Sequence, residues 1–129
     1  MFYYQYINEI FFRTNTMASV IEVLQYTLKP GTGEAFHAVM KEQSIPLHES
    51  CGLNVKRFGN SLDNKDKYYL VRAFSDISQM ETELAQFYAD VRWREGPRSK
   101  IINMIIESHR VVIPDNSLSD DSPSEYSEN

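Results

Sequence analysis

Several residue types and patterns are scarce in this sequence, and each scarcity excludes a class of protein. A single cysteine, Cys51, rules out an internal disulfide framework. No stretch approaches the roughly 18 uninterrupted apolar residues that a membrane-spanning helix needs. A phosphate-cradling glycine loop, a Gly-x-Ser-x-Gly elbow, a Cys-x-x-Cys pair and internal repeats are all missing. We therefore expect no membrane span, no cofactor and a cytoplasmic location, and neither nucleotide binding nor serine hydrolysis.

The sequence also has no excess of basic over acidic residues. The chain of 129 residues has a formal net charge of −5, but five of its 18 acidic residues lie in the last fifteen positions, which hold no Lys or Arg. Residues 1–114 therefore hold 13 acidic and 13 basic residues. Because a nucleic-acid-binding surface needs a basic stripe, we expect no nucleic-acid partner.

The chain divides into three zones. Residues 1–16 carry six aromatic side chains that fit neither a strand nor a helix period, and Met17 is followed by Ala18 and Ser19 as at a natural start. We interpret residues 1–16 as an N-terminal extension; the alternative is an arm that docks its aromatic rings on the domain. Residues 115–129 hold five serines and five acids, and we predict a disordered acidic tail. Residues 17–114 remain as one domain.

The domain alternates strands and helices. Apolar periodicity predicts strands over 20–28, 53–60, 67–75 and 106–113 and helices over 33–45, from Asp76 onward and over 98–105. Thr32 is the expected N-cap of the first helix and Pro46 its end or kink. Asp76 begins the second with Gln79 as in a capping box, and Gly96-Pro97 interrupts it. This order predicts an α+β fold, β-α-β-β-α-β, with a four-stranded antiparallel sheet and the helices on one face.

The first strand predicts a homodimer. Val20, Leu24, Tyr26 and Leu28 point one way, and Ile21, Val23 and Thr27 the other, so both faces carry apolar groups. An antiparallel sheet with one wet face would alternate cleanly between apolar and polar residues. Two helices cover only one face, and packing against the sheet of a second copy covers the other.

Polar residues on these strands are the first candidates for a site. Glu22 lies on the same face as Tyr26, and burying its charge is costly unless it is paired. We expect it to pair with Arg57, Arg72 or Arg110, or to act as a pocket carboxylate. Arg72 would bind an anionic substrate or form an ion pair across the dimer.

The histidines give further candidates. His109 faces the same side as Glu107 and Val111 and is expected to approach Glu22 or Gln25, either for acid–base chemistry or to satisfy buried polar groups. His37 is either a base or haem ligand at a pocket edge, or a boundary residue of its helix.

Two further features have a structural and a functional interpretation. Trp93 forms a pocket lid or, more commonly for a tryptophan, packs in the core. His48 and Cys51 are three residues apart, but a zinc site needs three or four ligands, so we expect a polar connection and no metal.

Four stretches also resemble a known family. EVLQYTLKPGTGEAF (residues 22–36), AFSDIS at the end of the third strand, the position of Trp93 and IESHRVVI in the last strand are similar to NIPSNAP-like proteins of the dimeric α/β-barrel group. The resemblance covers about residues 20–113, and Tyr-x-Leu-x-Pro-Gly is its most specific motif. It implies a ferredoxin-like fold, a dimer whose two sheets form a barrel, and a pocket between sheet and helices. Leu70 and Arg72 stand where that family commonly has His and Trp.

Three functions are consistent with these observations. The first is a homodimer that binds a small apolar or aromatic molecule between sheet and helices, with Glu22, Arg72 and Trp93 as ligand-binding residues. The alternative is a cofactor-independent monooxygenase or isomerase with His37, His109 or Tyr26 as the acid–base group. The third is a purely structural dimer.

Overall fold

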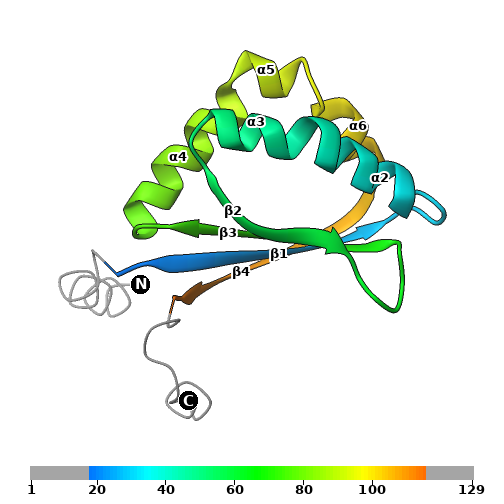
Figure 1. The fold of residues 1–129 in the computed structure, drawn as a ribbon, viewed down its shortest axis with the longest axis horizontal. Helices are drawn as coiled ribbons and strands as arrows, with labels where there is room; N and C mark the ends of the chain where they lie inside the picture. Colours follow the sequence, from blue (N-terminus) through cyan, green and yellow to red (C-terminus); the bar gives the residue numbers. More distant parts are fainter. Residues whose placement is uncertain (1–17, 116–129) are drawn as a thin grey trace, which may run out of the picture.

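The computed structural model describes residues 18–115, which fold in the predicted β-α-β-β-α-β order (Figure 1). The elements are β1 (Val20–Leu28), α2 (Gly33–Val39), the π-helical η1 (Met40–Ser44), α3 (Ile45–Ser50), β2 (Asn54–Asn60), β3 (Lys67–Phe74), α4 (Ile77–Ala89), α5 (Val91–Arg94), α6 (Arg98–Met104) and β4 (Ile105–Pro114). The proposed N-terminal extension and all of the tail after Asp115 lie outside the described residues.

The four strands form one antiparallel sheet in the order β2-β3-β1-β4. All the helices lie on one side of it, and the described chain leaves the opposite face bare (Figure 1). Because side chains alternate along a strand, residues at every second position of β1 point toward the helices. The fold is therefore α+β with the ferredoxin-like topology, as predicted.

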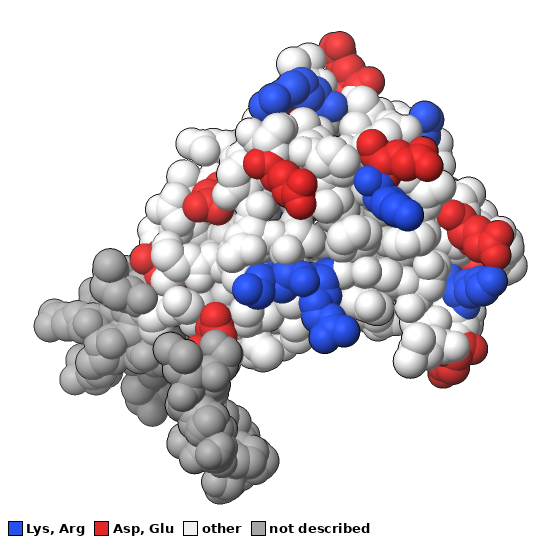
Figure 2. All heavy atoms as spheres, viewed as in Figure 1, with Lys and Arg blue, Asp and Glu red and all other residues white. Residues whose placement is uncertain are grey.

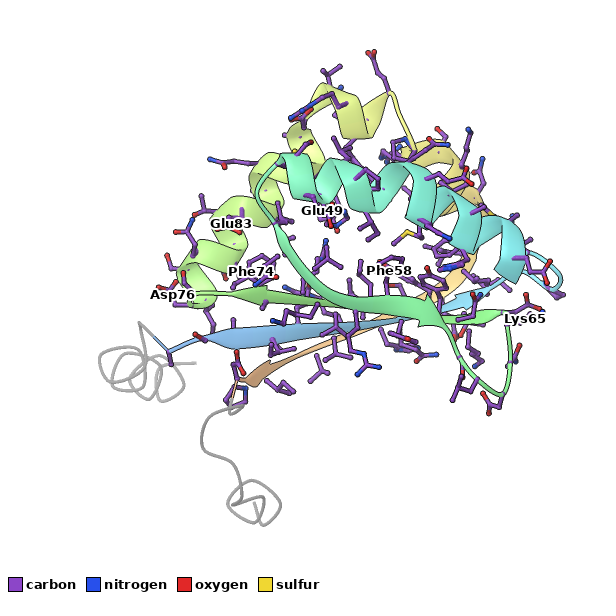
Figure 3. All side chains as sticks on the ribbon, in the orientation of Figure 1. Glu49, Phe58, Lys65, Phe74, Asp76 and Glu83 are labelled. Carbon is purple, nitrogen blue, oxygen red and sulfur yellow. The ribbon has the colours of Figure 1, made fainter. Side chains whose placement is uncertain are left out.

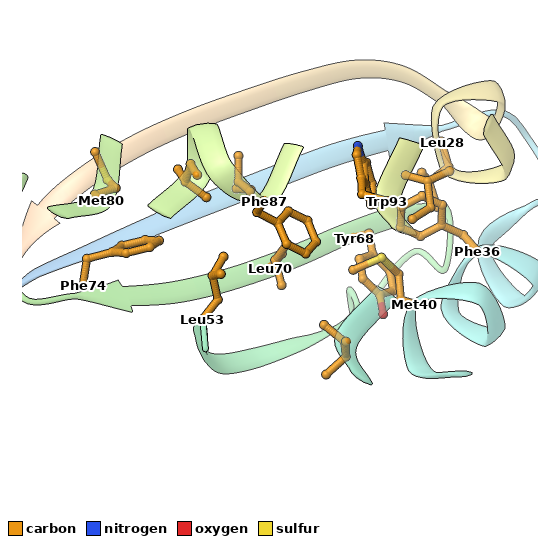
Figure 4. Close-up of a cluster of buried hydrophobic side chains, with 14 of the residues drawn as sticks. Leu28, Phe36, Met40, Leu53, Tyr68, Leu70, Phe74, Met80, Phe87 and Trp93 are labelled. Carbon is orange, nitrogen blue, oxygen red and sulfur yellow. The ribbon is translucent and has the colours of Figure 1, made fainter. Parts of the chain in front are cut away.

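The core fills the space between the sheet and the helices (Figure 4). Aromatic rings dominate one end, where Phe36 packs edge-on against Tyr68 with ring centroids 4.8 Å apart. Phe74 lies at the other end of β3 and points toward the helices (Figure 3). This dense packing gives the polar side chains that lie among these residues fixed surroundings.

The turn before α2 is capped differently from the prediction. Thr32 occupies the N-cap position, but its hydroxyl donates to the carbonyl oxygen of Lys29. The carboxylate of Asp66, from the β2–β3 connection, accepts hydrogen bonds from the backbone N–H groups of Gly31 (2.9 Å) and Gly33 (2.8 Å) instead. The hairpin thus caps the first helix, which the local sequence could not reveal.

Pro46 does not end the first helix, which was one of the two effects predicted for it. The chain widens into η1, where the N–H of Ile45 donates to the carbonyl of Met40, five residues earlier, and α3 then continues with Pro46 in its first turn. Proline is tolerated at this position because a first-turn N–H has no partner within its own helix. The continuation carries His48 into the core instead of leaving it in a polar connection.

The second helix begins as predicted and ends earlier. The side chain of Asp76 accepts from the N–H of Gln79, but the Gln79 side chain donates to Glu83 and does not complete a capping box. α4 stops at Ala89, because Asp90 adopts an extended backbone and caps α5 by accepting from the N–H of Arg92. The second helix therefore ends at Ala89, before the interruption predicted at Gly96-Pro97.

The uncovered face of the sheet is apolar at its centre, as the first strand predicted. Ile21 and Val23 of β1 pair with Ile113 and Val111 of β4, and in the single chain Val111 is 54% exposed and Ile113 42%. Acidic and basic side chains are interspersed on the side shown in Figure 2, without a basic stripe. Within residues 18–115, no helix is long and apolar enough to cross a membrane.

Candidate functional site

Glu22 is the centre of a buried network of charged and polar side chains. It lies on β1, facing the helices, and is 1% exposed. The Nε of Arg72, from the neighbouring strand β3, donates to Oε1 at 2.7 Å, and the Nε of Arg110, from β4, donates to Oε2 at 2.7 Å. The carboxylate is thus bound on both sides, which confirms two of the three partners predicted for it; Arg57 is not among them.

Arg72 connects the sheet to the helices through further contacts of its guanidinium group. Its Nη1 lies 3.0 Å from Nε2 of His48 and donates to the hydroxyl of Tyr88 at 3.0 Å. Nδ1 of His48 lies 2.8 Å from the carbonyl oxygen of Ser44 in η1. We call these five side chains, Glu22, Arg72, Arg110, His48 and Tyr88, the Glu22 network. It ties β1, β3 and β4 to α3 and α4.

The hydrogen bonds fix the protonation state of His48. A carbonyl oxygen only accepts and a guanidinium only donates, so the proton of the ring sits on Nδ1 and Nε2 is the acceptor. Burial, together with the positive charge of Arg72, lowers the pKa of His48 from 6.5 to about 4, although the hydrogen bond to Ser44 acts in the opposite direction. The histidine is therefore neutral at physiological pH.

Aromatic side chains surround the network. Tyr26 packs edge-on against Phe36, and Trp93 packs against Phe87 and Tyr88, with centroids 5.4 and 5.5 Å apart. Trp93 is buried, which agrees with the core interpretation of this residue. Burial raises the pKa of Tyr26, so its hydroxyl is a neutral hydrogen-bond donor at physiological pH and not a phenolate.

His37 belongs to a separate pair of side chains. It is half-buried on α2, and its Nδ1 lies 2.6 Å from the hydroxyl of the buried Tyr68. Burial raises the pKa of Tyr68, so the tyrosine keeps its proton, and a neutral phenol can both donate and accept a hydrogen bond. With its ring hydrogen on Nε2, His37 would accept at Nδ1 from Tyr68, and a base at His37 would then act by way of that hydroxyl.

His109 does not approach Glu22, contrary to one of the two predicted contacts. It is paired with Gln25 across β1 and β4, and residues paired across antiparallel strands share a face. That face is the uncovered one, opposite the face of Glu22. His109 is exposed there and lies 3.6 Å from Glu107. The three catalytic candidates are thus not gathered in one place.

Two members of the network, His48 and Tyr88, were not predicted as site residues from the sequence. His48 follows Phe36, Met40 and Ser44 at intervals of four residues, all three buried on one helical face, and this spacing would have indicated it had Pro46 not been taken as a helix end. Tyr88 appears at helical spacing as an alternative to Phe87. The residue is 41% exposed, and only the structure shows its hydroxyl reaching Arg72.

The surface hollows that are described for residues 18–115 lie away from the Glu22 network. The largest of those described has a volume of about 520 Å³ and opens beside the β2–β3 hairpin, where Gln25, Leu62 and Tyr69 line it. No network residue lines it. In the residues that the structure describes, no group of three or more His, Cys, Asp or Glu side chains is placed to hold a metal ion.

The network predicts that neutralising the buried carboxylate of Glu22 destabilises the protein far more than neutralising an exposed carboxylate. Glu22→Gln leaves Arg72 buried without a counter-charge, and we expect the free energy of unfolding to fall by about 3–5 kcal/mol in urea titrations followed by circular dichroism. Glu34→Gln, which breaks the exposed Lys65–Glu34 ion pair, is the matched control and should change stability little. Equal losses in the two variants would contradict the role given to Glu22.

The lowered pKa of His48 predicts a loss of stability in acid. The unfolded chain takes up a proton at this residue near pH 6.5 and the folded chain only near pH 4, so stability present above pH 6.5 is lost as the pH falls toward 4. Between pH 7 and 4 the wild type should lose about 3 kcal/mol more than His48→Gln, which keeps an acceptor for Arg72 but does not titrate. Parallel pH profiles of the two proteins in urea titrations would rule this out.

Comparisons with known proteins identify the fold. No protein-family model and no curated protein matches the sequence. Among solved structures, a NIPSNAP family protein of unknown function from Agrobacterium tumefaciens is 21% identical, with 76% of this chain and 88% of that chain covered and a TM-score of 0.69. An uncharacterized NIPSNAP-like domain protein from Burkholderia xenovorans is 15% identical, with 83% and 93% covered and a TM-score of 0.72.

An enzyme shares the fold at a lower score. SnoaB of Streptomyces nogalater, a cofactor-independent oxygenase, is 14% identical, with 74% of this chain and 91% of that chain covered and a TM-score of 0.54. Identities this low establish a common fold and nothing finer. The chain is thus NIPSNAP-like in fold, with the ferredoxin-like topology that those proteins and SnoaB share.

Proposed function

We propose that the protein is a homodimer that binds a small apolar or aromatic molecule between sheet and helices, beside the Glu22 network. The observation that carries this proposal is a buried ion pair, Glu22 and Arg72, beside the partly buried Tyr26 and the exposed Tyr88. A buried ion pair contributes little net stability compared with apolar side chains of similar volume. Its presence next to Tyr26, Tyr88 and Trp93 is therefore better explained by recognition of a ligand than by folding.

The proposed dimer rests on the uncovered face of the sheet. Its apolar centre, formed by β1 and β4 with Val71 of β3, has no cover within the described residues. An exposed apolar patch on a sheet is typical of an interface between subunits. Packing of two such faces would also bury Gln25 and His109, which gives His109 an interface position and not a catalytic one.

The dimer is tested by placing a charge on this face. Val111→Lys leaves the folded chain undisturbed, because Val111 is half exposed in the single subunit, but it places a charge in the proposed interface. Size-exclusion chromatography with light scattering should give twice the 15.0 kDa chain mass for the wild type and a single chain mass for the variant. Glu83→Lys, on α4 and so on the helical side of the sheet, opposite the uncovered face, is the control and should stay dimeric (Figure 3). A monomeric wild type at micromolar concentration would refute the dimer.

A second candidate function is a cofactor-independent monooxygenase or isomerase. Two observations favour it: the short contact between His37 and Tyr68, and the fold shared with SnoaB. In such an enzyme His37 would accept a proton by way of Tyr68, and Tyr26 would donate a hydrogen bond to the substrate as a neutral phenol.

The enzyme is tested with matched histidine variants. Oxygen consumption with a panel of polycyclic phenols is the readout, and His37→Ala should lower any turnover by about 100-fold or more, the usual contribution of a general base. His109→Ala removes a histidine from the opposite face and should retain turnover. If the wild type consumes no oxygen, or if His37→Ala keeps full activity in a folded protein, the enzyme hypothesis fails and the binding protein remains.

A further inference from the structure

The Glu22 network has one more positive charge than negative charges. Its single carboxylate is shared by two guanidinium groups, and His48 is held in its neutral form by Ser44 and Arg72. Tyr88 contributes a hydroxyl and no charge. The five side chains therefore sum to one positive charge that no member of the network balances.

Arg110 is the member of the network that solvent reaches. Its side chain is 46% exposed, whereas those of Glu22 and Arg72 are 1% exposed. Apart from Glu22, its guanidinium contacts the sulfur of Met80 at 3.5 Å, and a thioether is a weak acceptor. A guanidinium has five N–H donors in a planar fork, so Arg110 keeps donors for a further, stronger acceptor.

An aromatic surface adjoins this cation. Ser108 precedes Arg110 by two residues on the same face of β4, about 7 Å away along the strand, and is paired with Tyr26. α4 contributes Met80, which contacts Arg110, and two turns later Tyr88, whose hydroxyl accepts from Arg72. One end of this strip between β4 and α4 is thus cationic and the other aromatic.

We infer that the ligand is a monoanion with an apolar body, a small carboxylic acid, whose carboxylate binds Arg110 and whose body lies over Tyr26 and Tyr88. The inference rests on the proposed function and narrows its ligand to one chemical class. One surplus positive charge matches one carboxylate, whereas a phosphate dianion would leave a negative charge unbalanced beside Glu22. Arg72 positions the site from below by holding Glu22 and Tyr88, and does not itself contact the ligand.

Trp93 provides the readout. It is the one tryptophan of the chain, and its ring lies 5.5 Å from that of Tyr88, so a ligand on Tyr88 changes its fluorescence. Octanoate and octanamide are the matched probes, because they share an apolar body and differ in charge. With the wild type, octanoate should bind at least about tenfold more tightly than octanamide, as expected for a charge-assisted hydrogen bond to an arginine.

Variants assign this preference to Arg110. Arg110→Gln should bind both probes equally, Arg110→Lys should keep part of the preference, and Arg94→Gln, a charge loss on the exposed surface of α5, should keep all of it. Arg110→Gln still leaves Glu22 paired with Arg72, so the variant is expected to fold, as circular dichroism will check. Isothermal titration calorimetry gives an independent measure of each affinity, and inorganic phosphate serves as the dianion probe.

The outcomes separate the inference from the proposed function. Equal binding of octanoate and octanamide by the wild type overturns the anionic ligand but leaves an apolar binding site. Preferential binding of octanoate that survives in Arg110→Gln overturns the assignment to Arg110. Phosphate that displaces octanoate at equal concentration overturns the monoanion. Binding of neither octanoate nor octanamide overturns both the inference and the proposed binding function.

Discussion

The carboxylate of Glu22, bonded at 2.7 Å by arginines from the strands on either side of its own, is the interaction on which the rest of the structure depends. It lies in the middle of β1, where an unpaired charge would be excluded from an interior packed with aromatic rings. Pairing with Arg72 and Arg110 makes its burial possible and links three of the four strands. Through Arg72 the same carboxylate determines where Tyr88 and His48 lie, and so fixes the positions of α4 and α3 on the sheet.

The π-helical turn η1 positions the part of this network that comes from the helical layer. η1 inserts one residue before Pro46, and α3 then presents His48 to Arg72 with its Nδ1 bonded to Ser44 in that same turn. Such turns are rare in helices and occur often at functional sites. Here the irregular turn, the neutral histidine and the buried arginine form one unit, which supplies fixed polar groups beneath the aromatic surface of the proposed binding site.

The order of strands and helices was predictable because apolar periodicity and turn residues are local signals. Glu22 was expected to be paired for the same kind of reason, since its neighbours on β1 are apolar. The errors came from long-range contacts: Asp66 caps a helix 33 residues before it, and Arg72 gives His48 a partner 24 residues away. Pro46 concealed the continuing helix, and the sheet pairing that places His109 on the far face is set by the strand register and not by composition.

The central claim, that Glu22 and Arg72 are retained as a pair, is tested most directly by a double-mutant cycle. Glu22→Met, Arg72→Met and the combined variant would be compared with the wild type by urea unfolding at one protein concentration. Glu22→Met leaves the buried Arg72 without its counter-charge, and Arg72→Met leaves Glu22 with Arg110 alone, while the combined change removes both buried charges together. We predict that the double variant is more stable than either single variant, with a coupling of several kcal/mol. Losses that simply add in the double variant would contradict this account.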